Sequence, residues 1–339
     1  QLALLQPGVT VARSKTRTVN TGHGLQLSIG GARPVQNNFR LDGISLSDQT
    51  GSSIGSVNGL NLGVDALREF SVLTNGFSAE YGRAAGGVVN AATRSGGNEV
   101  HGAAAYFHRN DNLDARNFFD PREQPEFRRH QFAGNAGGPL RRDRAVFFAA
   151  YEGLRQQRGN TSTSTTLSAA ARQRAAAPEI ARLLPLFPLP NGAVTGDTGL
   201  FLFTNDLMSR ENFVTGRVDY HVSERRTLFF RYSLSDGKRN ELTAFAVGDS
   251  RNATRQQSAV VEETRVLSPS LSNSLRFGVA RTAMLNNLTT ARNAALDNPE
   301  SAFVPGMGVM GRVDIVGLTL FPGGSGSLDF DRTAFTSFQ

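Results

Sequence analysis

The chain has 339 residues, a formal net charge of +7, 36 glycines, no cysteine and no tryptophan. Without cysteine it can form no disulfide scaffold, cysteine zinc site, iron–sulfur cluster or thiol nucleophile. The longest apolar run, Ala145 to Tyr151, is far shorter than the roughly 20 residues that a membrane-spanning helix needs. The chain opens at Gln1 within an apolar phrase and shows no signal-peptide pattern, so we expect a fragment of a longer protein.

The positive charge does not predict a nucleic-acid partner. Only Lys15 and Lys238 are lysines, and the arginines are scattered along the chain in small clusters. There is no helix-turn-helix pattern and no basic stripe interleaved with stacking aromatic residues. We therefore expect arginines at turns and in a polar interior, and no nucleic acid among the partners.

Residues 1–97 are rich in Gly, Asn and Ser, with short mixed strands. The segment Ser28–Leu46 predicts two strands, with Asp42 and Gly43 as turn residues. The segment Val64–Thr74 predicts a brief helical start followed by a strand. A short strand is expected from Val88 to Thr93, where surrounding glycines indicate close approach to a packed neighbour.

From residue 98 onward, segments of about ten residues alternate in polarity, which is typical of strands with two different environments. In one of them Leu228, Phe230 and Tyr232 share a face, while Arg231 and Ser233 share the other. The pattern predicts eight strands: 101–109, 128–138, 144–154, 212–220, 227–235, 257–267, 271–281 and 312–320.

The connections between these strands alternate in length. Short turns are predicted at 138–144, 220–227 and 267–271, and long external loops near 110–127, 155–211, 236–256 and 282–311. An Ala-rich part of the longest loop is expected to form a short helix. Tight turns at one end and long loops at the other are typical of outer-membrane barrels. A soluble sheet with one wet face produces the same alternation along each strand, but does not sort its loops in this way.

A closed barrel is the only sheet that satisfies every backbone group within a bilayer. Its outer face must be apolar, because Arg or Lys at the bilayer midplane costs about 2–4 kcal/mol. We therefore expect the charged residues of the alternating strands to face the lumen, namely Arg217, Asp219, Arg231 and Arg276.

Several motifs resemble TonB-dependent outer-membrane receptors, specifically their Oar-like branch. They are LDGISL (41–46), VDALREFSVLT (64–74), EYGRAAGGVVNAATRSGG (80–97), HGAAAYFHRNDNLDARNFF (101–119) and FFAAYEGLRQ (147–156). The resemblance implies a mainly β fold: a transmembrane antiparallel β-barrel preceded by a small mixed α/β plug domain. Residues 1–97 would be an N-terminally truncated plug, and 98–339 the first part of the barrel. About eight strands of an expected 22 are present.

The resemblance also implies a function, namely energy-coupled uptake of a scarce ligand across the outer membrane of a Gram-negative bacterium. The implied partners are TonB, ExbB and ExbD, outer-membrane lipid and lipopolysaccharide, and a small-molecule, glycan or peptide ligand. The loop between the first plug strands is often an apical ligand contact in this family. Here it offers Arg33, Gln36, Asn37 and Asn38, although a solvated turn stabilised by Asn side chains explains the same residues.

Other functional classes remain as alternatives. One is a structural or adhesive Oar-like protein without transport, and another is a soluble secreted β-domain. The five histidines are dispersed and none lies in an HExxH frame, and no GxSxG, GxxxxGK[ST] or GxGxxG context is present. We therefore expect no enzymatic activity, no cofactor and no metal site.

Overall fold

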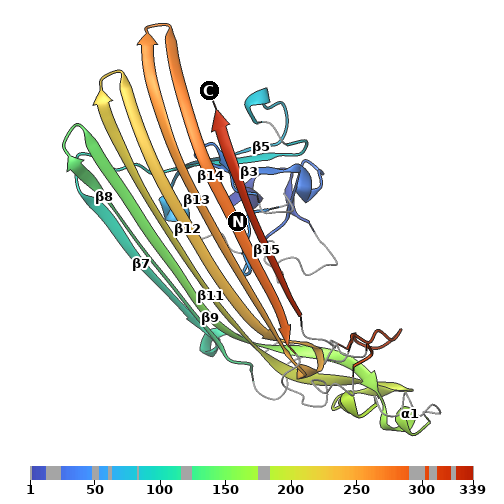
Figure 1. Cartoon of the computed structure of the whole chain (residues 1–339). Coiled ribbons are helices and arrows are strands. Elements are labelled where there is room, and N and C mark those ends of the chain that lie inside the picture. The colour runs from blue at the N-terminus through green and yellow to red at the C-terminus, as the bar shows by residue number, and fades with distance from the viewer. Residues whose placement is uncertain are drawn as a thin grey trace.

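The computed structural model describes residues 2–12, 24–47, 53–59, 63–81, 84–115, 124–174, 184–289, 302–304, 311–321 and 326–338. Two sheets dominate this part of the chain, a large curved one and a small one held against it (Figure 1). Within the described residues no helix has the length and apolar character needed to cross a membrane.

The large sheet, which we call the wall, is antiparallel throughout. Its strand order is β15-β14-β13-β12-β11-β9-β8-β7, so strands adjacent along the chain are also adjacent in space, with short β10 attached to β11. The wall strands are β7 (His101–Asn110), β8 (Phe127–Arg141), β9 (Ala145–Leu167), β10 (Val194–Thr195), β11 (Thr198–Ser223), β12 (Arg226–Leu242), β13 (Asp249–Ser268), β14 (Leu271–Thr289) and β15 (Gly326–Phe338).

Seven of the eight predicted strands coincide with wall strands, and one prediction is wrong. Residues 312–320 form no strand; they contribute a single bridge between Val313 and Phe321, and the last strand is β15. The apolar residues that suggested a strand there serve another purpose. Val313 packs against a cluster formed by Phe187, Phe245, Val247 and Phe321 in the loops.

Three of the predicted long loops are also wrong in extent, since β14 continues to Thr289 and thus into the loop predicted at 282–311, and two others are shorter than predicted. β9 and β11 pair continuously out to Leu167 and Thr198, which shortens 155–211 to the connection 168–197. Likewise, β12 and β13 leave only 243–248 between them. The polarity pattern missed these extensions because it registers an apolar face alternating with a polar one, which the Thr- and Ser-rich end of β9 and the polar end of β12 do not show. The predicted helix in the Ala-rich segment is present as α1 (Ala169–Gln173), whose first turn is capped by Ser168.

The second sheet, which we call the inner sheet, comes from the N-terminal part of the chain and has the order β4-β3-β6-β5. β3 (Asn38–Leu41) and β6 (Val88–Thr93) are parallel; β4 (Ile44–Ser45) and β5 (Leu67–Leu73) flank them antiparallel. β1 (Val9–Val11) and β2 (Leu27–Ile29) form a separate antiparallel pair. Single 3-10 turns complete the described part: 2–5, 34–36, 64–66, 79–81, 111–113, 184–186 and 244–246.

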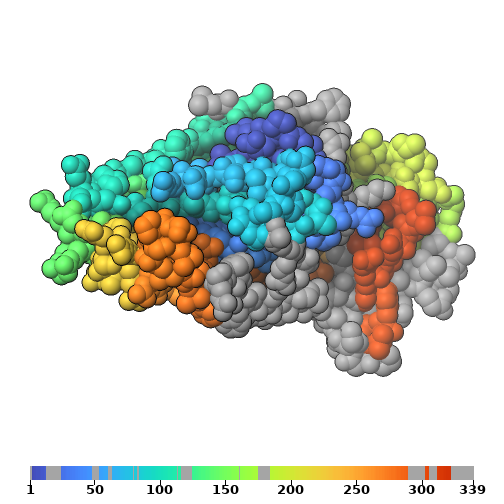
Figure 2. All heavy atoms as spheres, turned by 90° about the horizontal axis from the view of Figure 1, so that it is seen from above, coloured from blue at the N-terminus to red at the C-terminus, as the bar shows by residue number. Residues whose placement is uncertain are grey.

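The inner sheet runs across the wall strands, on one side of the wall (Figure 1). Seen from above, the N-terminal residues in blue and cyan pack beside the turn ends of the wall strands in green, yellow and orange (Figure 2). The wall face that the inner sheet covers carries many buried polar residues beside apolar ones such as Val260: Thr215, Arg231, Ser233 and Ser258 are each at most 5% exposed. The opposite face carries exposed Val218, Phe230, Val261 and Phe277. This inversion of the usual soluble pattern fits a wall with lipid on its outer side.

Candidate interface between the inner sheet and the wall

The predicted Asp42-Gly43 turn is confirmed, and it points at the wall. Both residues have positive φ, 48° and 78°, which matches the type I′ turn that Asp-Gly favours between paired strands. Leu41 and Ile44 close the hairpin on either side. The tight turn therefore brings the Asp42 carboxylate to the end of the inner sheet nearest the wall.

The Asp42 carboxylate joins the two sheets. Its Oδ1 accepts a hydrogen bond from the Thr93 backbone N–H (2.9 Å), and its Oδ2 accepts one from the Thr93 hydroxyl (2.9 Å). From the wall, Arg231 Nε donates to Oδ2 at 3.0 Å, and Arg217 Nη1 lies 3.6 Å from Oδ1. The carboxylate is thus compensated by one arginine in direct contact and a second nearby.

Arg231 is fully buried, and each of the three nitrogens of its guanidinium donates a hydrogen bond. Besides Asp42, it donates to the Ser258 hydroxyl (2.5 Å) and the Ser233 hydroxyl (3.2 Å) on the wall. It also donates to the Leu41 carbonyl of the inner sheet (3.2 Å). A buried charge is tolerated only when it is paired and hydrogen-bonded, and this arrangement meets both conditions.

Arg217 and Asp219 extend the contact along β11. Arg217 Nη2 donates to Asp219 Oδ1 at 2.7 Å, and Nη1 donates to the Thr93 hydroxyl at 3.1 Å. Its guanidinium also lies 4.3 Å from the centre of the Phe229 ring. Asp219 in turn accepts from the Ser95 hydroxyl at 2.7 Å. The chain segment that leaves the inner sheet is therefore held at two successive points.

The third arginine of this face, Arg276, lies against the turn glycine. It pairs with Glu262 on the neighbouring strand, and a Cβ added at Gly43 would overlap its guanidinium. On the inner sheet, Arg40 donates to the Gly43 carbonyl (2.9 Å) and the Glu80 carbonyl (3.1 Å). Burial and the nearby Arg276 lower the pKa of Arg40 from its ordinary value.

Apolar side chains fill the space around these charges. Leu41, Ile44 and Leu46 pack on Val260 and Ala280 of the wall. Ile44 lies directly over Gly278, where an added Cβ would overlap its side chain. A glycine on the inward face of β14 therefore makes the close approach of the inner sheet sterically feasible.

Farther toward the loop end of the wall, two buried carboxylates hold Gly63 and the segment 56–58. Glu152 accepts a hydrogen bond from the Gly63 backbone N–H at 2.6 Å. Glu211 accepts from the Asn58 side chain at 3.0 Å, and the Ser56 hydroxyl lies 3.4 Å from one of its oxygens. The sequence analysis did not identify either glutamate as an inward residue. The alternation of polar and apolar residues along β9 and β11 nevertheless places both on the same inward face as Thr215.

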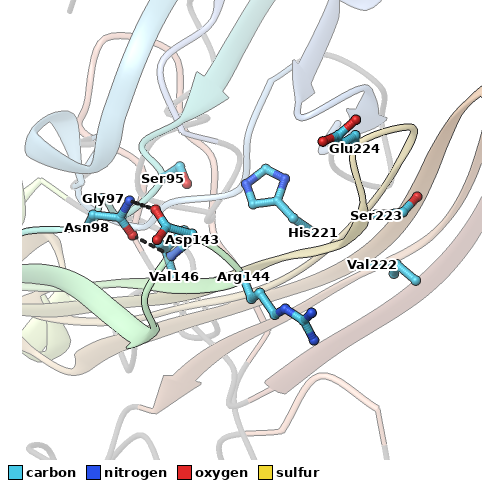
Figure 3. A pocket seen from close by; sticks show the side chains of 11 residues that line it. Ser95, Gly97, Asn98, Asp143, Arg144, Val146, His221, Val222, Ser223 and Glu224 are labelled. Atoms are coloured by element: carbon cyan, nitrogen blue, oxygen red, sulfur yellow. Dashed lines mark hydrogen bonds between the residues drawn. The ribbon is translucent and has the colours of Figure 1, made fainter.

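Several hollows border the interface, and two of them bear on its polar contacts. One, of about 380 Å³, lies between the sheets and is lined by Arg40, Asp42, Arg217, Glu262 and Arg276 among others. The other, of about 840 Å³, opens at the turn end between residues 95–98 and the turns at 143–146 and 221–224 (Figure 3). There Asn98 and Asp143 bond reciprocally, Asn98 Nδ2 to Asp143 Oδ1 at 2.7 Å and Asp143 N–H to Asn98 Oδ1 at 2.9 Å (Figure 3).

The four predicted ligand-contact residues divide into two pairs. Asn37 and Asn38 are buried and serve the inner sheet: Asn37 bonds the Leu27 carbonyl and the Gly87 N–H, and Asn38 accepts from the Ser45 hydroxyl. Arg33 and Gln36 are exposed. The Gln36 side chain accepts from the Arg33 backbone N–H at 2.8 Å, so this amide braces the turn that carries Arg33. Within the described residues, no group of three or more His, Asp or Glu lies together as a metal-binding cluster would require.

The sequence also matches known proteins. A curated relative, the TonB-dependent transporter Oar of Myxococcus xanthus, is 31% identical over 140 residues, which are 39% of this chain and 12% of that protein. Among solved structures, the outer membrane transporter YddB from Escherichia coli aligns with a TM-score of 0.54 at 17% identity, over 84% of this chain and 36% of YddB. The siderophore receptor PiuA from Acinetobacter baumannii aligns with a TM-score of 0.47 at 11% identity, over 98% of this chain and 50% of PiuA.

The family model described as "Outer membrane beta barrel domain" matches residues 92–177 and 173–337, which together are most of the chain. This match agrees with the antiparallel wall and its apolar outer face. It contradicts the alternative of a soluble secreted β-domain. The chain belongs to the outer-membrane β-barrel domain family, and its wall lies in the outer membrane of a Gram-negative bacterium.

Proposed function

We propose that this chain is part of a TonB-dependent receptor of the Oar-like branch. Residues 1–97 act as its plug and 98–339 as the first part of its barrel. The match to the Oar transporter and the fold of YddB support the assignment. The observation that carries it is the Asp42–Arg231 contact, because it fastens an N-terminal sheet to the inner face of the wall.

The proposed activity is energy-coupled uptake of a scarce ligand. TonB, driven through ExbB and ExbD, would pull on the plug and separate it from the wall. The contacts of Asp42, Thr93 and Arg217 suit such a step, since all three residues border a hollow of about 380 Å³ that can admit water. Hydrogen bonds broken between the sheets would then be exchanged for bonds to water, which keeps their net cost modest.

We assign ligand contact to the loop that carries Arg33 and Gln36, with Asn37 and Asn38 positioning it. An exposed guanidinium beside an amide suits a polar or anionic ligand, whether a small molecule, a glycan or a peptide. The side chains of Arg33, Gln36, Asn37 and Asn38 are a guanidinium and three amides, which suit recognition of a ligand. We therefore propose recognition and transport rather than catalysis. Outer-membrane lipid and lipopolysaccharide are the proposed surroundings of the wall.

One observation favours the adhesive alternative. β9 and β11 pair from Ala145–Tyr220 to Leu167–Thr198, far beyond the roughly 9–11 residues that a tilted spanning strand needs. A ribbon of this length projects past the membrane on the loop side. Such a projection suits attachment to a surface outside the membrane.

Binding of TonB separates the two functions. The complete gene product, purified in detergent, is tested for capture by the immobilised periplasmic domain of TonB. Transport predicts capture that is competed by free TonB domain. A correctly folded complete gene product that is not captured would overturn the transport proposal in favour of attachment.

A further inference from the structure

Three tyrosines mark where the apolar outer face of the wall ends on the loop side. Each is bonded to a polar side chain on a neighbouring strand: Tyr106 hydroxyl with His130 Nδ1 (2.7 Å), Tyr151 hydroxyl to Asn212 Oδ1 (3.0 Å), and Gln257 Nε2 to Tyr232 hydroxyl (2.7 Å). Tyrosines with an apolar body and a hydrogen-bonded tip lie at membrane interfaces, where barrels carry aromatic girdles. The hydrocarbon region therefore lies on the turn side of these residues, and lipid headgroups on the loop side.

Farther toward the loop end than the tyrosines, basic residues occupy adjacent strands in one register. His130 of β8 is opposite Arg155 of β9, Arg155 is opposite Arg210 of β11, and Arg210 is opposite Lys238 of β12. We call these four residues the basic row. Residues directly opposite in an antiparallel pair point to the same face, and this face is the outer one, since the row alternates with inward Leu154 and Glu211.

Such a row is unfavourable on its own, because like charges directly opposite each other destabilise a strand pair. Within the described residues, neither Arg210 nor Lys238 makes an ion pair, and both side chains are exposed. Arg155 uses part of its guanidinium on the Asn212 side chain and on the carbonyls of Leu154 and Glu211. The row therefore lacks an anion from the described part of the chain.

The basic surface continues onto β13 and β14 as a hollow. Lys238, Arg255 and Arg281 line a hollow of about 230 Å³, together with Ala283 and Leu285. Asp236 also lines it and accepts a hydrogen bond from Arg255 Nε at 2.9 Å. The hollow lies on the loop side of the tyrosines, and its cationic side chains lie beside small apolar ones. This arrangement matches a lipid whose phosphate groups lie toward solvent and whose acyl chains lie toward the membrane centre.

We propose that the basic row and this hollow form a binding site for the phosphate groups of lipopolysaccharide, on the outer surface of β8–β14. The inference deepens the proposed contact with lipopolysaccharide by naming the residues that make it. Charge complementarity selects this occupant: the outer leaflet presents phosphorylated lipid at the depth of the row, and Arg and Lys bind phosphate through charge-assisted hydrogen bonds.

The test measures binding of bisphosphorylated lipid A to the complete gene product in nanodiscs of phosphatidylcholine. The double variant Arg210→Gln/Lys238→Gln is expected to weaken binding by about tenfold for each charged group that no longer reaches a phosphate. A charge-preserving variant, Arg210→Lys/Lys238→Arg, should retain most of the affinity. The matched control, Arg225→Gln/Arg265→Gln, removes the same charge at the turn end and should bind as the parent does.

Dephosphorylated lipid A and inorganic phosphate complete the design. Equal affinity for phosphorylated and dephosphorylated lipid A would overturn the proposal, and so would equal weakening in the turn-end control. Full competition by millimolar inorganic phosphate would show a free-anion site instead of a lipid site, which also overturns it. Heat-modifiable migration reports folding of each variant. Capture by TonB, which involves the plug, is expected to be the same for these variants as for the parent. A failure of the lipid-binding proposal can therefore be distinguished from a failure of the transport proposal.

Discussion

Arg231 of the wall and Asp42 of the inner sheet form an ion pair across 189 positions of sequence, and their side chains are 0% and 3% exposed. Since both charges are removed from water, the pair is favourable only because Thr93, Ser233 and Ser258 satisfy the remaining bonding sites. The position of the inner sheet on the wall is therefore specified by polar contacts as well as by shape.

Removing one charge of this pair should loosen the inner sheet. Asp42→Ala leaves the Arg231 guanidinium buried without its carboxylate, which costs about 3–5 kcal/mol. Hydrogen exchange of the complete gene product should show faster exchange in 38–46 and 88–95. The double variant Asp42→Ala/Arg231→Met should recover part of the stability. An exchange pattern unchanged in Asp42→Ala would contradict the role given to the pair.

The close approach of Ile44 to Gly278 predicts steric coupling. Gly278→Ala places a methyl group in the space of the Ile44 side chain and should destabilise docking by about 1–3 kcal/mol. Ile44→Ala removes the overlapping atoms, so Gly278→Ala should cost less in that background. A double-mutant cycle on the chemical-denaturation midpoint measures the coupling. Additive effects would mean that the two residues do not meet.

Glu211 is expected to hold the segment 53–59 as a hydrogen-bond acceptor. Glu211→Leu removes the acceptor for Asn58 and Ser56 and should expose that segment to limited proteolysis. Glu211→Gln keeps a carbonyl oxygen in place and serves as the matched control. If both variants resist cleavage to the same degree as the parent, the segment is held by other contacts.

The outer face of the wall is expected to reject charge. Phe230 is 50% exposed on that face, and Phe230→Arg should cost about 2–4 kcal/mol near the bilayer midplane, whereas Phe230→Leu should cost little. Folding yield into phospholipid vesicles, read from heat-modifiable migration, gives the comparison. Equal yields for the two variants would place Phe230 outside the hydrocarbon.

Polarity alternation predicted the parts of the wall strands that face lipid. It located 227–235 within β12 and 271–281 within β14 because an apolar outer face and a polar inner face differ there. It failed toward the loop ends, where the Ser- and Thr-rich end of β9 shows no alternation of apolar and polar residues and where Phe201 of β11 packs against a loop cluster. It also mistook 312–320 for a strand, since Val313 contributes its apolar side chain to a loop cluster instead.

For the interface, the sequence predicted the inward arginines and the Asp42-Gly43 turn, but not which groups meet. Pairing of Asp42 with Arg231 depends on how the inner sheet is placed, which no local pattern encodes. The same holds for Asn37: an amide in a predicted surface loop is in fact buried between the Leu27 carbonyl and the Gly87 N–H. A polar residue that caps distant backbone groups cannot be told from an exposed one by composition.

A disulfide between the N-terminal region and the wall tests their relative placement most directly, and this chain has no cysteine of its own. A Cβ at Gly55 would lie 2.9 Å from Thr282 Cγ2, so Gly55→Cys/Thr282→Cys should oxidise in intact outer membranes. Peptide mass spectrometry should then recover the linked 55–282 pair. Gly55→Cys/Arg281→Cys places the second thiol on the outer face and should stay reduced. Absence of the first link, or formation of the second, would contradict an N-terminal sheet seated on the polar inner face of the wall.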